Sequence, residues 1–130
     1  MKTILVDAVD GFVVETEDGF KIFQEMHNLL ETFPNKKIIL TGANDQQFNE
    51  FGLDKMPYEV FTLKHDPEKT DPKYYETMLE HFHLDNGEVI YFEHNKDAVK
   101  SAKFAGIKTY YYYPDKKDLN ALKEFLKKNL

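Results

Sequence analysis

The sequence contains no cysteine, which excludes disulfide bonds, thiolate metal ligands and cysteine nucleophiles. It also lacks any apolar run of 18 residues, so no segment is predicted to span a membrane. The apolar stretch at the start is interrupted by Asp7, which argues against the apolar core of a signal peptide. Together these absences favour a cytoplasmic protein.

Positive charge is in short supply as well, because 17 basic residues face 23 Asp and Glu and leave a net charge of −6. A broad nucleic-acid or anionic-membrane surface needs clustered Lys and Arg, so neither nucleic acid nor a membrane is an expected partner. Apolar residues make up 42% of the chain, which argues against disorder. A length of 130 residues suits one domain, residues 1–130, with a core of its own.

Five short runs of β-branched and aliphatic residues predict buried strands at 3–6, 36–41, 59–63, 88–92 and 107–112. Between them, and after the last, apolar residues recur at helical spacing. This alternation predicts an α/β fold of three layers, a doubly wound five-stranded parallel sheet with helices on both faces. The third strand is the least apolar and is expected near an edge of the sheet.

The segment after the first strand has two predicted parts. Residues 12–19 suit a small hairpin or flap with Gly19 as its hinge. From Phe20 to Phe33 apolar residues recur at three- and four-residue steps, which predicts an amphipathic helix that Pro34 ends. Three later helices have polar residues suited to cap their starts, namely Asn44 or Asp45, Asp71 (followed by Pro72), and Asn95.

Polar side chains follow the first, second and fourth predicted strands and the loop after the third. They are Asp7 and Asp10, then Thr41, Lys69, and finally Glu93 with His94. The carboxyl ends of parallel strands meet at one edge of the sheet, where open α/β folds bind ligands. Carboxylates suit Mg²⁺, a hydroxyl and an ammonium group suit phosphate oxygens, and an acid can carry a proton, so the set favours phosphoryl chemistry.

Four segments, in order along the chain, carry a family resemblance: Asp7-Ala8-Val9-Asp10-Gly11-Phe12, Leu40-Thr41-Gly42, Lys69-Thr70-Asp71-Pro72 and Phe92-Glu93-His94-Asn95. Over nearly its whole length the chain resembles the haloacid dehalogenase superfamily of phosphohydrolases. The resemblance implies a sheet with strand order 5-4-1-2-3, and neither usual insertion point has room for a cap domain.

The resemblance also implies roles for individual residues. Asp7 would attack phosphorus and Asp10 would act as acid and base. Thr41, Gly42 and Lys69 would hold the phosphoryl oxygens, while Asp7, Glu93 and His94 would hold Mg²⁺. An open, capless site would suit a large phosphorylated substrate or a lid from another subunit, and the oligomeric state is left open.

The first and fourth motifs depart from the family pattern. Aligning Asp10-Gly11 with the family motif places Ala8 at the nucleophile position, whereas aligning the strands keeps Asp7 there and inserts one residue before Asp10. Phe12 replaces the family's Thr. His94 stands where a second acid commonly binds the metal, and imidazole is a poor ligand for Mg²⁺, so another divalent metal or no metal is an open alternative.

Two further functional classes share features with this sequence. A catalytically inactive member that keeps the fold as a binding or interaction module is the main alternative. A phospho-receiver domain would need an aspartate after the third strand, where this chain has Leu63 and Lys64, so it is set aside.

Overall fold

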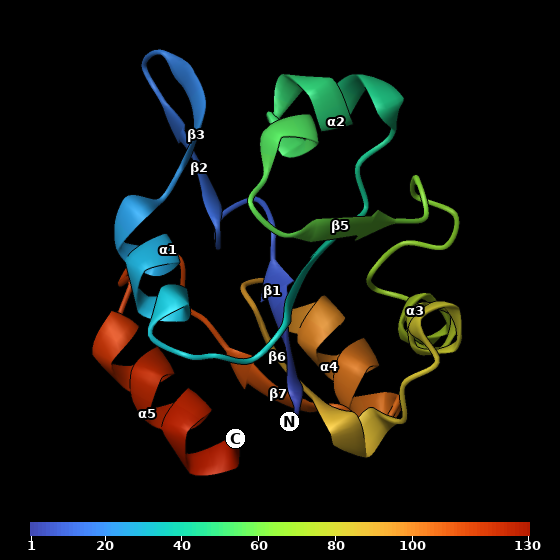
Figure 1. The fold of residues 1–130 in the computed structure, drawn as a ribbon. Coiled ribbons are helices and arrows are strands. Elements are labelled where there is room, and N and C mark those ends of the chain that lie inside the picture. The colour runs from blue at the N-terminus through green and yellow to red at the C-terminus, as the bar shows by residue number, and fades with distance from the viewer.

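A five-stranded parallel sheet forms the centre of the computed structural model, which describes residues 1–130 (Figure 1). Its strands are β1 (Thr3–Asp7), β4 (Lys37–Thr41), β5 (Glu59–Thr62), β6 (Val89–Glu93) and β7 (Lys108–Tyr111). They lie in the order β5-β4-β1-β6-β7. Counted along the chain within this sheet alone, the order is 3-2-1-4-5, which is the expected 5-4-1-2-3 read from the opposite edge.

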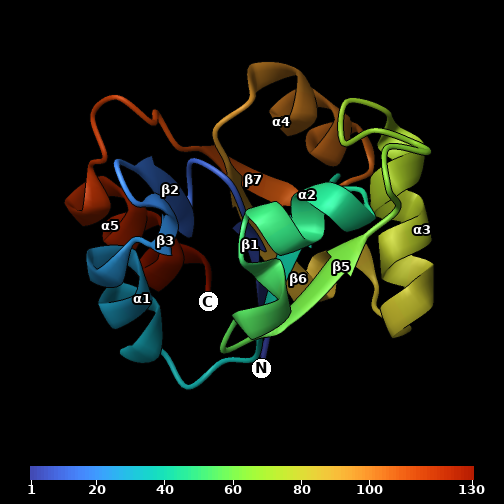
Figure 2. The same ribbon diagram turned by 90° about the horizontal axis from the view of Figure 1, so that it is seen from above.

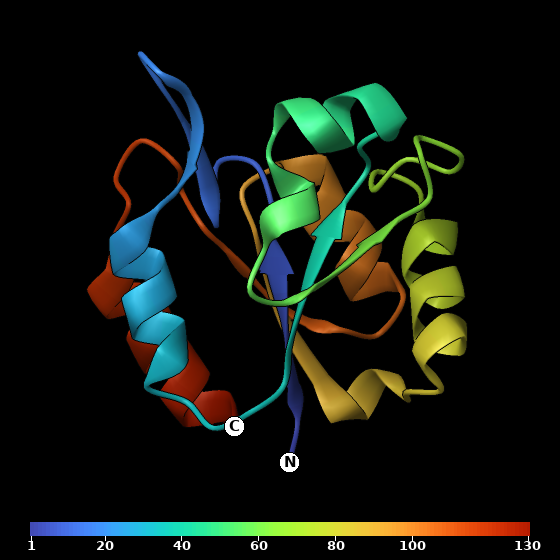
Figure 3. The same cartoon turned by 45° about the horizontal axis from the view of Figure 1, so that its top comes forward.

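Helices cover both faces of the sheet, so the predicted three-layer α/β architecture is confirmed (Figures 2 and 3). Helices α1 (Gln24–Glu31) and α5 (Leu119–Asn129) lie on one face, and α3 (Pro72–Phe82) and α4 (Lys96–Phe104) lie on the other. The short helix α2 (Asp45–Glu50) sits beyond the carboxyl edge of the strands. β5 is an edge strand, as its composition predicts.

The three central strands are buried along their whole length because helices cover each side of the sheet. One face contributes Ile4, Val6 and Ala8 to a core shared with α1 and α5. The opposite face contributes Leu5 to a second core shared with α3 and α4. Since side chains alternate along a strand, Asp7 at the end of β1 lies on the face of Leu5, and Ala8 lies on the face of Ile4 and Val6.

The predicted hairpin is present, but it takes residues that the periodicity assigned to the following helix. Strands β2 (Val13–Thr16) and β3 (Gly19–Ile22) pair antiparallel, with Val13 opposite Ile22. The expected helix start at Phe20 is therefore wrong, and α1 begins at Gln24. The Phe20 ring packs against Phe51 at 4.6 Å between centroids, which holds the hairpin beside the carboxyl edge of the sheet.

Capping residues set the starts of the helices that follow the site-bearing strands. Asn44, Asp71 and Asn95 each accept a hydrogen bond from a backbone N–H in the first turn of their helices. Short 3-10 turns cover Leu53–Lys55 and Asn86–Glu88.

None of the helices has the length and apolar character that a membrane crossing requires. The chain has no cap domain.

Candidate functional site

Asp7 is the last residue of β1 and lies on the same side of the strand as Leu5, opposite Ala8. Its side chain is 1% exposed and lines a cavity of about 200 Å³ at the carboxyl edge of the sheet. Ala8 instead packs in the apolar core with Phe12. Of the two residues that sequence alignment allowed at this position, only Asp7 has its side chain at the cavity.

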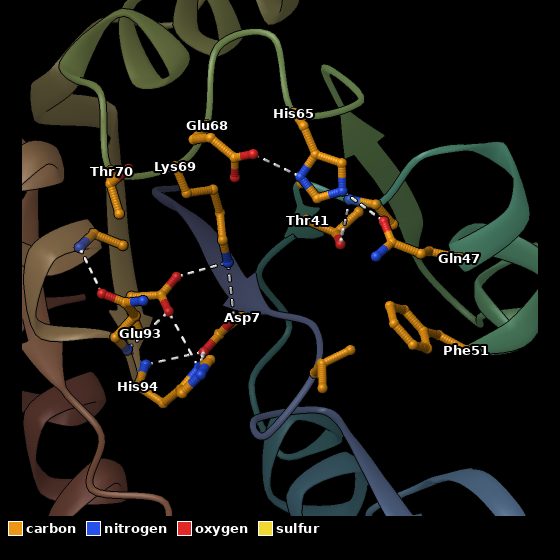
Figure 4. A pocket seen from close by; sticks show the side chains of 15 residues that line it. Asp7, Thr41, Gln47, Phe51, His65, Glu68, Lys69, Thr70, Glu93 and His94 are labelled. Carbon is orange, nitrogen blue, oxygen red and sulfur yellow. Dashed lines mark hydrogen bonds and ion pairs between the residues drawn. The ribbon is translucent and has the colours of Figure 1, made fainter.

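Lys69 reaches the same point from the loop before α3 (Figure 4). Its Nζ donates to Asp7 Oδ1 at 2.9 Å and to Glu93 Oε1 at 2.7 Å. The carbonyl oxygen of Leu40 and the hydroxyl of Tyr91 each lie 3.4 Å from the same nitrogen. A single ammonium group therefore joins the ends of β1 and β6, and its charge is held close to two buried carboxylates.

Glu93 ends β6 with a side chain that is fully buried and fully hydrogen-bonded. Besides Lys69, its Oε1 accepts a short hydrogen bond from the hydroxyl of Tyr91. Its Oε2 accepts the backbone N–H of Asn95 at 3.0 Å. This placement allows a charged group in the interior, because a buried carboxylate is tolerated when each oxygen has a donor.

His94 closes the other side of the cluster. Its backbone N–H donates to Asp7 Oδ2 at 2.9 Å, and its ring Nδ1 lies 2.5 Å from the same oxygen. Nδ1 is also 3.2 Å from Glu93 Oε2, and Nε2 is 3.6 Å from Asp10 Oδ2. The imidazole thus spans the space from the buried carboxylates to the rim of the cavity (Figure 4).

Burial and neighbouring charge move the ionisation of these groups in different directions. Burial, together with the negative charge of Glu93, raises the pKa of Asp7. Burial also opposes ionisation of Glu93, but the charge of Lys69 and hydrogen bonds from His94, Lys69 and Tyr91 lower its pKa. Neighbouring charge and hydrogen bonding therefore favour the ionised form of Glu93, whereas burial beside Glu93 disfavours the ionised form of Asp7.

The neighbouring carboxylates raise the pKa of both basic side chains, Lys69 and His94. Burial disfavours the charged form of Lys69, yet the charges of Asp7 and Glu93 raise its pKa overall. Burial likewise disfavours the charged imidazole of His94, but hydrogen bonds to Asp7 and Glu93 raise its pKa to about 10. The contacts with Asp7 and Glu93 therefore favour the protonated forms of Lys69 and His94.

Thr41 and Gly42 lie at the cavity beside this cluster. The Thr41 hydroxyl accepts the backbone N–H of Ala43 at 3.2 Å and has its own proton available to donate. The backbone N–H groups of Gly42 and Val9, which also line the cavity, donate to no group in the chain. Free N–H groups beside an ammonium suit an anion, because they offer fixed donors to its oxygens.

Asp10 is the predicted site residue that the structure leaves outside the cavity. Its side chain is 53% exposed, and its backbone adopts a left-handed conformation with φ 69°. Asp7 O accepts the N–H of Phe12 at 2.9 Å, which closes the turn that contains Asp10. This turn follows β1 directly and places Asp10 at the rim, with its Oδ2 3.6 Å from His94 Nε2.

The far wall of the cavity carries polar residues that the sequence analysis did not assign. His65 Nδ1 lies 2.9 Å from Glu68 Oε1, and His65 Nε2 lies 2.5 Å from Gln47 Oε1 (Figure 4). Both His65 and Glu68 belong to the loop that carries Lys69. That shared loop is the signal that could have found them, since a loop that delivers one site residue often delivers its neighbours.

Comparison with known proteins was informative only at the level of structure. No protein-family model and no curated protein sequence matches the chain. A HAD family enzyme of Bacteroides thetaiotaomicron, solved as an aspartate-to-alanine mutant with magnesium and inorganic phosphate, superposes with a TM-score of 0.63 at 11% identity. That match covers 85% of this chain and 93% of the enzyme. The chain has a haloacid dehalogenase-like fold.

Two other solved structures share this haloacid dehalogenase-like fold over less than half of their own length. A haloacid dehalogenase-like protein of unknown function from Agrobacterium tumefaciens gives a TM-score of 0.59 at 17% identity, covering 72% of this chain and 46% of that one. A protein of Thermotoga maritima provisionally assigned as β-phosphoglucomutase gives a TM-score of 0.51 at 26% identity. That match covers 68% of this chain and 44% of the other. The additional parts of those proteins have no counterpart here.

The three expected metal ligands, Asp7, Glu93 and His94, are not arranged in a way that fits Mg²⁺. One ligand atom from each of Asp7, Glu93 and His94 lies within 4.8 Å of the others, which is close enough to share an ion. However, each carboxylate already binds Lys69 through one oxygen and His94 through the other. Mg²⁺ needs oxygen ligands at about 2.0–2.1 Å in octahedral geometry, and here an imidazole takes the place of the third carboxylate.

Proposed function

We propose that the cavity binds the phosphoryl group of a phosphate monoester and that Asp7 attacks phosphorus. One observation supports this most directly: the Asp7 carboxylate and the Lys69 ammonium group lie 2.9 Å apart at the wall of one cavity. Thr41 lines the same cavity, as do Val9 and Gly42, whose backbone N–H groups donate to no group in the chain. A nucleophile and donors for phosphate oxygens are therefore available together.

The proposed reaction has two displacements at phosphorus. An Asp7 oxygen forms a bond to phosphorus while the ester P–O bond breaks, and the leaving oxygen takes a proton from the carboxyl group of Asp10. Water then attacks phosphorus, gives a proton to the Asp10 carboxylate and breaks the bond to Asp7, which releases inorganic phosphate and restores both side chains. Lys69 stabilises the negative charge on the phosphoryl oxygens during both steps.

The size of the cavity bears on the class of substrate. At about 200 Å³ it is smaller than the roughly 300–1,000 Å³ that is usual for drug-sized ligands. It suits a phosphoryl group and the atoms next to it, so the remainder of a substrate would lie outside. No cap encloses the opening, which agrees with a large phosphorylated substrate as the proposed partner.

Replacing Asp7 with asparagine tests the nucleophile. The variant keeps the size of the side chain but removes its negative charge, so hydrolysis of an aryl phosphate is expected to fall to background, a loss of at least about a thousandfold. Turnover should be followed with Mg²⁺, with Mn²⁺ and with a chelator. Asp54→Asn, which changes an exposed aspartate that does not line the cavity, should keep full activity. Equal turnover in wild type and Asp7→Asn would overturn the assignment.

The proton donor can be separated from the nucleophile by the choice of leaving group. An aryl oxide leaves without much protonation, whereas an alkyl oxide needs an acid, so loss of the acid should slow alkyl phosphates by about 10²–10⁴-fold and aryl phosphates far less. We expect this selective loss in Asp10→Asn, as the sequence predicts. The same loss in His65→Gln, with Asp10→Asn unaffected, would move the role to the His65 and Glu68 pair.

Binding without turnover is the second candidate function. It is favoured by the fact that both oxygens of Asp7 are engaged, one by Lys69 and one by His94, and that Asp10 lies outside the cavity. A protein of this kind would bind inorganic phosphate in calorimetry, and Asp7→Asn would leave all rates of ester hydrolysis at background. The two measurements together distinguish a phosphatase from a phosphate-binding module.

A further inference from the structure

Two buried carboxylates at neighbouring strand ends need polar partners, and this cluster supplies them from its own side chains. Asp7 and Glu93 end the adjacent strands β1 and β6 and are 1% and 0% exposed. Lys69 contacts Asp7 Oδ1 and Glu93 Oε1, while His94 contacts Asp7 Oδ2 and Glu93 Oε2. Each basic group bridges both acids, and no carboxylate oxygen is left without a partner.

The position of the His94 ring is the position that a shared divalent ion would need. An ion bound between the two acids opposite Lys69 would have to contact Asp7 Oδ2 and Glu93 Oε2. Those are the two oxygens that lie 2.5 and 3.2 Å from Nδ1 of the ring. Because a metal–oxygen bond of about 2.1–2.5 Å would place the ion on the imidazole itself, ring and ion exclude one another.

The outer edge of the His94 ring lies beside Asp10, so the altered fourth motif and the altered first motif are neighbours. His94 Nε2 faces Asp10 Oδ2 at 3.6 Å, so the imidazole fills the gap between the inward-facing Asp7 and the rim-facing Asp10. In the turn from Asp7 to Phe12 the backbone of Asp10 is left-handed and its side chain is exposed, so Asp10 is directed outward. The altered first motif and the altered fourth motif therefore complement each other sterically.

We propose that the His94 side chain replaces the divalent cation at this site, so that phosphate is held by His94 and Lys69 without a metal. The binding of phosphate by His94 and Lys69 rests on the proposed function. The replacement of the metal by the His94 ring rests only on the contacts of His94. The site is then a phosphate-binding pocket in which the His94 imidazole occupies the place of an ion beside the Lys69 ammonium group.

The test compares metal responses of the wild-type chain and His94→Asp. The thermal unfolding midpoint of the wild type should be the same in chelator, Mg²⁺ and Mn²⁺. His94→Asp removes the ring that lies between the two acids and adds a third acid, so it should unfold at a lower temperature in chelator and regain stability with either metal. His83→Asp makes the same change at an exposed position on α3's end and should respond to neither. A wild type stabilised by metal as much as His94→Asp would overturn the replacement.

Inorganic phosphate provides the second readout. Its affinity for the wild type, measured by calorimetry, should be equal in chelator and in Mg²⁺. His94→Asn, which keeps a polar side chain without adding charge, should bind phosphate about tenfold more weakly and show no metal response. Phosphate binding that is lost in chelator, or that is unchanged in His94→Asn, would overturn the role given to His94. A wild type that binds no phosphate in either buffer would refute the proposed function, while the metal response would still decide the replacement.

Discussion

Replacing Lys69 with methionine is expected to lower the free energy of unfolding by about 3–5 kcal/mol at neutral pH and to abolish phosphate binding. The side chain of Lys69 is 15% exposed and contacts two carboxylates that are almost completely buried. Methionine keeps an unbranched stem of similar length, so the loss comes from charge rather than from packing. Removing one member of a buried ionic cluster leaves the other charges unpaired, which is why the expected effect is large.

The loss caused by Lys69→Met should depend on pH in a definite direction. In the wild type the pKa of Glu93 is lowered, so its contribution to stability is present above the pKa of the unfolded chain and is lost as the pH falls. In the variant the carboxylates are buried without the ammonium group, so they take up protons more readily when folded. Denaturant unfolding from pH 7 down to about pH 4 should show the difference between the two proteins shrinking.

Two controls separate this cluster from a general effect of charge. Lys73→Met removes an exposed lysine on α3 and should change the free energy of unfolding by less than about 0.5 kcal/mol. The double variant Lys69→Met with Asp7→Asn should be more stable than the sum of the two single changes predicts, because each removes a charge that the other leaves unpaired. Strict additivity would contradict the contact between Lys69 and Asp7.

Much of this arrangement could be predicted from the sequence because parallel topology gathers the ends of separate strands. The strands β1, β4 and β6 are apolar throughout, which predicts burial on both faces, and their carboxyl ends must share one edge. Asp7, Thr41 and Glu93 follow from their position in the strands alone. Lys69 follows from its place just before the capped start of α3.

Other features depend on backbone geometry that has no local sequence signal. The hairpin strand β3 was assigned to a helix because Phe20, Ile22, Phe23 and Met26 satisfy both a strand and a helix period at their junction. His65 reaches the cavity through a loop in which both Lys64 and His65 have positive φ. Such conformations are uncommon outside glycine, and sequence periodicity gives no indication of them.

The turn that places Asp10 on the rim also relies on a glycine, and its replacement is expected to be the second large effect. A Cβ atom at Gly11 would lie 2.5 Å from the carbonyl oxygen of Asp7, with the Asp7 Cβ and carbonyl carbon at 3.1 and 3.2 Å. The nearest atom is backbone, and its oxygen already accepts the N–H of Phe12 at 2.9 Å. The turn must therefore open to admit a methyl group, and Asp7 must move with it.

We expect Gly11→Ala to lower the free energy of unfolding by about 1–3 kcal/mol, the usual range for overpacking. Displacement of Asp7 should also separate it from Lys69 and His94, so affinity for inorganic phosphate should fall together with stability. Gly87→Ala is the matched control, because a Cβ there meets nothing within 4 Å, and it should bind phosphate as the wild type does. If Gly11→Ala unfolds and binds phosphate like Gly87→Ala, the turn has room for a side chain. The close approach of Gly11 to Asp7 would then have no part in holding Asp7 in place.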